Sequence, residues 1–186
     1  SGGVSFLTRW PHQKLVDGGC GATDHNSMTR PIETKRLLVV AHAPSVNTRS
    51  LLDAVLTGAG SPEVSGVDVV HIPPLEAKPD DVLAAHALIL GTTENLGYMS
   101  GALKDFFDRI YYPCLEKTQG LSYALYIRAG QDGTGTRRAV ESITTGLRWR
   151  PVQEPLTLRG DFKGDFISQC KELGAVMAAG IEAGVF

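Results

Sequence analysis

The stretch that decides the fold is Arg-Leu-Leu-Val-Val-Ala-His-Ala-Pro-Ser-Val-Asn-Thr-Arg-Ser-Leu-Leu-Asp-Ala-Val-Leu, residues 36–56. The uninterrupted apolar run at residues 37–41 is typical of a strand that is covered on both faces, as in a parallel sheet. Pro44 ends this strand, and leucine and valine then recur at helical spacing over residues 51–56. We therefore predict a strand, a short polar loop and a helix, which together form the opening unit of a parallel α/β fold.

The loop of this unit carries Ser45, Asn47 and Thr48. Hydroxyls, free backbone amides and the positive end of a helix dipole meet at one point here, and this combination suits an anion such as phosphate. The same side chains could instead serve as plain helix caps in a loop that binds nothing. The residues of this loop are compatible with both interpretations.

Composition narrows the class of protein. The chain has 186 residues, of which 42% are hydrophobic and 20% are charged, and its formal net charge is -2. This length allows one domain with a substantial core, and the absence of a basic stretch argues against nucleic-acid binding. Three scattered cysteines without a Cys-x-x-Cys pair argue against disulfides and a metal site, so we predict a cytoplasmic protein. No apolar run is long enough to predict a membrane span.

The N-terminal segment, residues 1–34, differs from the rest of the chain, because it is rich in glycine and shows no sustained periodicity. We interpret it as an added leader or a disordered tail, with Met28 as the candidate native start. Residues 35–186 would then form the folded domain. A genuine extension that packs on the domain is the alternative.

The rest of the chain alternates between predicted strands and helices. Further strands are expected at residues 67–72, 87–91, 121–128 and 151–158, and further helices at residues 79–83, 101–112, around 140–147 and at 165–183. Gly58 and Gly60 are expected to end the first helix, and Pro113 the third. Residues 92–100 are expected to form a polar loop, and no strand pair is joined by a tight hairpin signal.

This alternation predicts an α/β fold with one five-stranded parallel sheet between two layers of helices. The simplest strand order is 2-1-3-4-5, in which the chain changes direction between strands one and three. Ligands bind such sheets at the carboxyl ends of the strands beside this point. No acidic cluster, Cys or Gly-Lys-Ser/Thr follows the first strand, which argues against a phosphate-accepting signalling domain, a cysteine phosphatase and a P-loop. A Gly-x-Gly-x-x-Gly motif is also absent there.

Two motifs resemble the flavodoxin-like flavoprotein family, which includes flavodoxins and NAD(P)H-dependent FMN reductases. They are Ser45-x-Asn47-Thr48 and Thr92-Thr93-Glu94-Asn95-Leu96-Gly97-Tyr98-Met99-Ser100-Gly101-x-x-Lys104-x-x-x-Asp108. The similarity covers residues 35–186, and Met-Ser-Gly-x-x-Lys-x-x-x-Asp is its most specific part. The first loop is nearer to the reductase pattern than to the Thr-Gly-rich loop of flavodoxins. Glu94 departs from the family pattern, in which a small or aromatic residue is common nearby.

The resemblance implies an FMN site built from three loops. The first loop would hold the phosphate through Ser45, Asn47 and Thr48, without a basic residue. The second would wrap the flavin ring, and the third would meet polar ring atoms or ribityl hydroxyls. The implied residues of these two loops are Thr92, Thr93, Glu94, Asn95, Leu96, Gly97, Tyr98, Ala129, Gly130, Gln131, Asp132 and Gly133.

Each implied role has a plainer alternative. Tyr98 could cover the flavin ring or simply pack on the following helix, and Asp132-Gly133 is also a common turn pair. Phe106 and Phe107 are expected in the core, and His42 is expected to be structural. We predict no catalytic residue, because the flavin itself would carry the hydride and electron chemistry.

The resemblance favours an FMN-dependent oxidoreductase that takes hydride from NAD(P)H and reduces a quinone or a similar small acceptor. A flavodoxin-type electron carrier is the first alternative, although the net charge of -2 does not match the strongly acidic carriers. A flavodoxin-like binding module without flavin is the second, and Glu94 keeps it open. The expected partner is a small-molecule acceptor, and the sequence leaves a homo-oligomer open.

Overall fold

The computed structural model describes residues 34–186, so the predicted leader or tail lies, except for residue 34, outside the described residues. The strands are β1 (Lys35–Ala41), β2 (Val67–Ile72), β3 (Ala87–Asn95), β4 (Tyr98–Met99), β5 (Ser122–Ala129), β6 (Arg150–Pro151) and β7 (Leu156–Arg159). The helices are α1 (Val46–Ala59), α2 (Pro79–Leu83), α3 (Gly101–Cys114), α4 (Thr134–Gly146) and α5 (Gly164–Glu182). Among these described residues, no helix is long and apolar enough to cross a bilayer.

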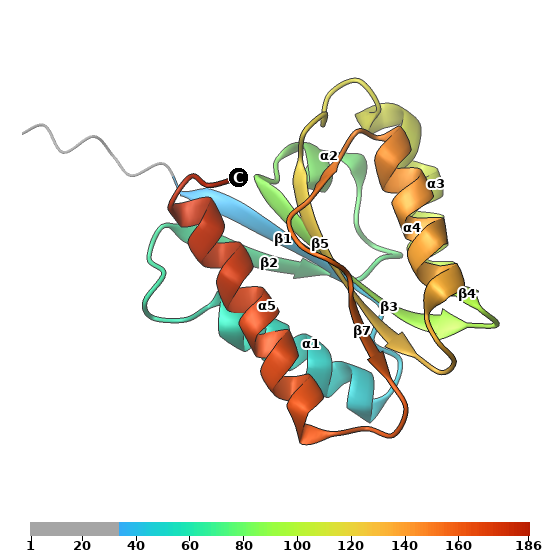
Figure 1. The fold of residues 1–186 in the computed structure, drawn as a ribbon. Helices are drawn as coiled ribbons and strands as arrows, with labels where there is room; N and C mark the ends of the chain where they lie inside the picture. Colours follow the sequence, from blue (N-terminus) through green and yellow to red (C-terminus); the bar gives the residue numbers. More distant parts are fainter. Residues whose placement is uncertain (1–33) are drawn as a thin grey trace, which may run out of the picture. The chain divides into compact units, whose positions relative to one another are not determined.

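The parallel sheet has the order β2-β1-β3-β5-β6, which confirms the predicted order because β5 is the fourth of the predicted strands (Figure 1). The predicted fifth strand is split into β6 and β7, and both pair in parallel with β5. Residues 152–155 belong to neither strand, although the Val152 amide still donates to the Tyr123 carbonyl of β5 at 2.9 Å. Pro155 within this break has no amide hydrogen to donate.

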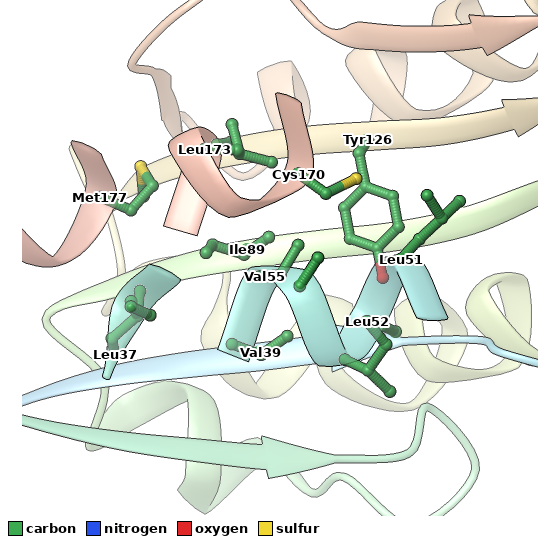
Figure 2. Close-up of a cluster of buried hydrophobic side chains, with 14 of the residues drawn as sticks. Leu37, Val39, Leu51, Leu52, Val55, Ile89, Tyr126, Cys170, Leu173 and Met177 are labelled. Carbon is green, nitrogen blue, oxygen red and sulfur yellow. The ribbon is translucent and has the colours of Figure 1, made fainter. Parts of the chain in front are cut away.

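The two faces of the sheet carry separate hydrophobic clusters, as the apolar run in β1 predicts. Leu37 and Val39 face α1 and α5, whereas Leu38 and Val40 face α2, α3 and α4, and all four side chains are fully buried. Figure 2 shows the first cluster, in which Leu37, Val39 and Ile89 of the sheet lie beneath Val55 of α1 and residues of α5. A strand with alternate side chains in two cores explains why the sequence pattern does not alternate.

Helices α1 and α5 approach each other closely, and this corrects the expectation that Gly58 ends α1. The helix continues to Ala59, and Gly60 is its C-cap. A Cβ atom at Gly58 would lie 1.8 Å from the carbonyl oxygen of Lys171, and one at Gly174 would lie 2.1 Å from that of Val55. Gly58 is therefore a packing residue that allows backbone-to-backbone contact.

The segment after the third predicted strand is a β-hairpin, not the expected polar loop. Strand β3 continues to Asn95, and β4 returns antiparallel to it, with Glu94 opposite Met99 and Asn95 opposite Tyr98. Leu96 and Gly97 form the turn with positive φ angles of 54° and 74°. Such turns usually contain Asn-Gly or Asp-Gly, and leucine rarely adopts this conformation, so the sequence lacks the usual signal.

Helix α3 follows the hairpin directly. The Ser100 hydroxyl accepts a hydrogen bond from the Leu103 amide at 3.2 Å and caps the helix. Phe106 and Phe107 are buried in the core, as predicted. The helix ends one residue beyond Pro113, because a proline in the last turn removes one amide donor without preventing the turn from closing.

Candidate functional site at the carboxyl edge of the sheet

Three segments meet at one pocket of about 270 Å³: the loop after β1, the β3–β4 hairpin, and the end of β5 with the residues that follow it. They are called the first, second and third loops below. The pocket lies at the carboxyl ends of neighbouring parallel strands, where the topology predicts a ligand site. The pocket is lined by Ser45, Asn47, Thr48, Thr93, Glu94, Asn95, Arg128, Ala129 and Gly130. All of these except Arg128 are among the residues implied by the resemblance. The implied residues that do not line it are Thr92, Leu96, Gly97, Tyr98, Gln131, Asp132 and Gly133.

The first loop caps α1 and still presents donors to the pocket. The Thr48 amide donates to Ser45 Oγ at 3.3 Å, and the Ser45 amide donates to Thr48 Oγ1 at 2.8 Å, which forms a capping box. Asn47 is exposed, and its side chain forms no hydrogen bond within residues 34–186. The amides of Val46 and Asn47, in the first turn, have no intrahelical acceptor. Capping therefore accounts for Ser45 and Thr48 but leaves Asn47 free.

The second loop contributes two threonines that play different parts. Thr92 is buried, and its hydroxyl accepts from the Ser100 amide at 3.0 Å and donates to the Thr93 carbonyl at 3.0 Å. The hydroxyl oxygen of Thr93 is also buried, but it has no hydrogen-bond partner among the described residues. Because buried hydroxyls are normally paired, Thr93, which lines the pocket, has hydrogen-bonding capacity that the described residues do not use.

Glu94 joins the second loop to the third. Its carboxylate accepts hydrogen bonds from the Gln131 amide at 2.6 Å and from the Gly133 amide at 3.1 Å. Both amides belong to the third loop, which the resemblance implies would meet polar ring atoms or ribityl hydroxyls. The departure from the family pattern thus has a structural consequence, because a carboxylate of the chain itself occupies this part of the third loop.

The third loop leads into α4 through Asp132. Its carboxylate accepts from the Thr134 amide at 2.8 Å, and this bond lowers the pKa of Asp132 below its ordinary value. The Gly97 carbonyl of the hairpin lies against Gly135, where a Cβ atom would be 2.0 Å from the oxygen. The hairpin and the start of α4 therefore fit together without room for a side chain at that point.

Tyr98 lies on β4 with 43% of its surface exposed, and Leu96 at the hairpin turn is fully exposed. Neither side chain lines the pocket. Leu96 and Tyr98 thus give this edge of the molecule an apolar, solvent-facing surface. The role of Tyr98 at a flavin ring stays a prediction.

Arg128 is the pocket residue that the sequence reasoning missed. Its guanidinium donates to the carbonyls of Ala129 at 2.7 Å, Leu158 at 2.9 Å and Gly160 at 2.6 Å, and it lies 5.7 Å from the centre of the Phe166 ring. It makes no ion pair with any residue from 34 to 186. The available signal was a single charge at the end of an otherwise apolar strand.

Solved structures with this arrangement include flavodoxins. A flavodoxin from the domain Archaea superposes with a TM-score of 0.67 at 21% identity, over 79% of this chain and 99% of that one. The chain has the flavodoxin-like fold. The two-electron reduced flavodoxin of Megasphaera elsdenii gives a TM-score of 0.62 at 19% identity, over 77% of this chain and 98% of the other. A WrbA-like flavodoxin from Agrobacterium tumefaciens gives 0.61 at 15% identity, over 81% and 98%.

A sequence relative supports the same assignment. A flavodoxin of Aquifex aeolicus (strain VF5) is 31% identical over 112 residues, which is 60% of this chain and 60% of that flavodoxin. No protein-family model matches the chain. The resemblance to the flavodoxin-like flavoproteins indicated by the sequence motifs is thereby confirmed.

Proposed function

We propose that this flavodoxin-like chain binds FMN and acts as a redox flavoprotein. The observation that carries the proposal is the pocket in which three loops bring together polar groups, among them the unpaired Thr93 hydroxyl. These residues fit the group, because hydroxyls, amides and a guanidinium are the donors that a phosphate and a polyhydroxy chain require. The resemblance to flavodoxins gives the same cofactor.

In this proposal the phosphate lies on the first loop. Asn47 and the free amides at the start of α1 would hold it, and the helix dipole would favour its charge. Arg128 would add a positive charge from the floor of the pocket. The Thr93 hydroxyl would either donate a hydrogen bond to the ribityl chain or accept one from it. The hairpin and the third loop would border the flavin ring.

When bound, FMN supplies the hydride and electron chemistry, and the protein binds and orients it. We propose NAD(P)H as the donor and a quinone or a similar small molecule as the acceptor. The reductase-like Ser-x-Asn pattern at residues 45–47 and the modest net charge of -2 support this choice.

Each of the two alternatives has one observation in its favour. The Aquifex aeolicus relative is a flavodoxin, which favours an electron carrier. The Glu94 carboxylate occupies the amides of Gln131 and Gly133, which favours a binding module without flavin. Flavin binding is our first choice over an empty module because the pocket leaves Asn47 and Thr93 free for a ligand. The reductase is preferred to the carrier because of the Ser-x-Asn pattern and the modest net charge.

The test compares NADH and NADPH oxidation by the FMN-loaded protein with that by an equal amount of free FMN, with a benzoquinone as acceptor. We expect faster oxidation by the protein, and a loss of FMN affinity in Thr93→Val, which removes the hydroxyl but keeps the shape. Thr57→Val, on the exposed side of α1, is the matched control. Bound FMN that neither nicotinamide reduces would support the carrier, and failure to bind FMN would support the module.

A further inference from the structure

A second pocket lies on the other side of the β1–α1 loop and shares no lining residue with the first. It has a volume of about 340 Å³ and is formed by the carboxyl ends of β1 and β2 and the first turns of α1 and α3. Its walls are largely apolar and include Leu52, Pro73, Pro74 and Ala102. A concave, mostly apolar pocket of this volume with a few polar groups is typical of a small-molecule site.

His71 is one of the polar residues that line this pocket. Its Nε2 atom is buried and has no hydrogen-bond partner among residues 34–186. Burial lowers the pKa of His71 more than the Ala41 backbone and the carboxylates of Glu76 and Asp53 raise it, so the ring is neutral at neutral pH. A neutral imidazole nitrogen either donates or accepts, according to its tautomer, and a hydroxyl group can satisfy either state.

Two groups of opposite charge border the same space. Arg49 and Glu76 both line the pocket, and Arg49 forms no ion pair in the described part of the chain. An anionic ligand would meet Glu76, and a cationic one would meet Arg49. This pairing favours a neutral ligand over a carboxylate or an ammonium group. His42 is the second histidine that lines this pocket, and burial lowers the pKa of His42 as well.

We propose that this pocket binds a small, neutral, mostly apolar molecule that carries one hydroxyl group; phenol, a simple aromatic example, is the probe. The ring would lie against Leu52, the two prolines and Ala102, and its hydroxyl would pair with His71 Nε2. The proposal does not depend on flavin binding, because the residues involved are separate from those of the first pocket.

The test compares phenol with toluene, which has a methyl group in place of the hydroxyl, by amide NMR titration of the full chain. Toluene is more apolar than phenol, so it would bind more tightly than phenol to a pocket that offers apolar contacts alone. We expect phenol to bind about fivefold more tightly, because one buried hydrogen bond contributes on the order of 1 kcal/mol. The shifted amides should be those of Ala41, His42 and His71.

Two variants make the test specific. Ala102→Leu should fill the pocket and abolish phenol binding, and His71→Leu should reverse the preference so that toluene binds at least as well. Ala179→Leu on the exposed face of α5 and His86→Leu at the far edge are the matched controls. If Ala102→Leu does not fold, His71→Leu decides alone. The proposal is overturned if wild type shows no shifts with millimolar phenol, if it binds toluene as tightly, or if the variants leave binding unchanged.

Discussion

Glu94 is a carboxylate that departs from the flavodoxin-like pattern, in which a small or aromatic residue is common nearby. It satisfies the amides of Gln131, in the loop before α4, and of Gly133, the N-cap of α4. Hydrogen bonds to a charged acceptor are about twice as strong as neutral ones, and a negative charge is favoured near a helix N-terminus. This one side chain therefore holds the second and third loops together, and it competes with any ligand for the same donors.

The first prediction concerns Glu94→Gln. The neutral amide is a weaker acceptor, so hydrogen exchange at the Gln131 and Gly133 amides should become about fivefold faster, which corresponds to a loss on the order of 1 kcal/mol. We also expect tighter FMN binding, because the competing carboxylate is gone. Glu63→Gln, in an exposed loop, is the control. Unchanged exchange at the two amides would show that Glu94 does not hold the third loop.

Residue roles that depend on neighbours in the sequence can be predicted from it, whereas roles that depend on contacts between distant residues cannot. The cap at Ser45 follows from local spacing, because a capping box lies within four residues. The bonds from Gln131 and Gly133 to Glu94 cross 37 and 39 residues of chain, so no local pattern reveals them. Arg128 was missed because its partners Leu158 and Gly160 also lie about thirty residues away.

The contact between α1 and α5 gives the second prediction. In Gly58→Ala the new methyl group would meet the Lys171 carbonyl, so the helices must move apart. We expect a net loss of about 1–3 kcal/mol in the free energy of unfolding, despite the better helix propensity of alanine. Gly101→Ala, where a Cβ atom would meet nothing within 4 Å, should be neutral or stabilising in the same denaturant titrations. Equal stabilities of the two variants would contradict the close packing.

The end of α5 gives the third prediction. The Glu182 carboxylate accepts from the Ser65 amide at 2.8 Å and the Gly66 amide at 3.0 Å, and these bonds lower its pKa below the ordinary value of 4.5. Its stabilising effect is therefore complete above the unfolded pKa and is lost as the pH falls through the folded one. Glu182→Gln should melt a few degrees below wild type at neutral pH.

The difference between wild type and Glu182→Gln should shrink as the melting temperature is measured at decreasing pH, from the ordinary pKa of 4.5 down through the lowered pKa of the folded state, where the carboxyl becomes protonated. Glu172→Gln, elsewhere on α5 and exposed, should show no such pH dependence. A melting difference that stays constant from neutral to acidic pH would mean that the two backbone bonds do not depend on the charge.

At the level of elements, apolar runs and helical spacing predicted every central strand and every helix. The β-hairpin was missed because Leu96 stands where the turn usually has asparagine or aspartate. Gly58 was assigned to a helix end because glycine in a sequence indicates either a stop or a close contact, and only the position of α5 distinguishes them. The split of β6 from β7 depends on pairing with β5, which is likewise a non-local contact.

For the molecule from residue 34 to 186, the order of the strands determines where ligands can bind. Strand β1 lies between β2 and β3, so its loop separates a polar pocket on the β3 side from an apolar pocket on the β2 side. The sequence predicted the first pocket because its three loops carry polar motifs. The second consists mainly of alanine, proline and leucine side chains, which carry no sequence signal for a binding site.

The central claim is that the polar pocket binds the phosphate of FMN. The most direct test compares the affinity of the protein for FMN with its affinity for riboflavin, which lacks that phosphate. Charged hydrogen bonds contribute roughly 1.5–3 kcal/mol each, so a net preference of even ~3 kcal/mol makes FMN about a hundredfold tighter. Asn47→Ala should weaken FMN alone and leave thermal stability nearly unchanged, because Asn47 is not the helix cap. Equal affinity of the wild type for FMN and riboflavin would contradict the claim.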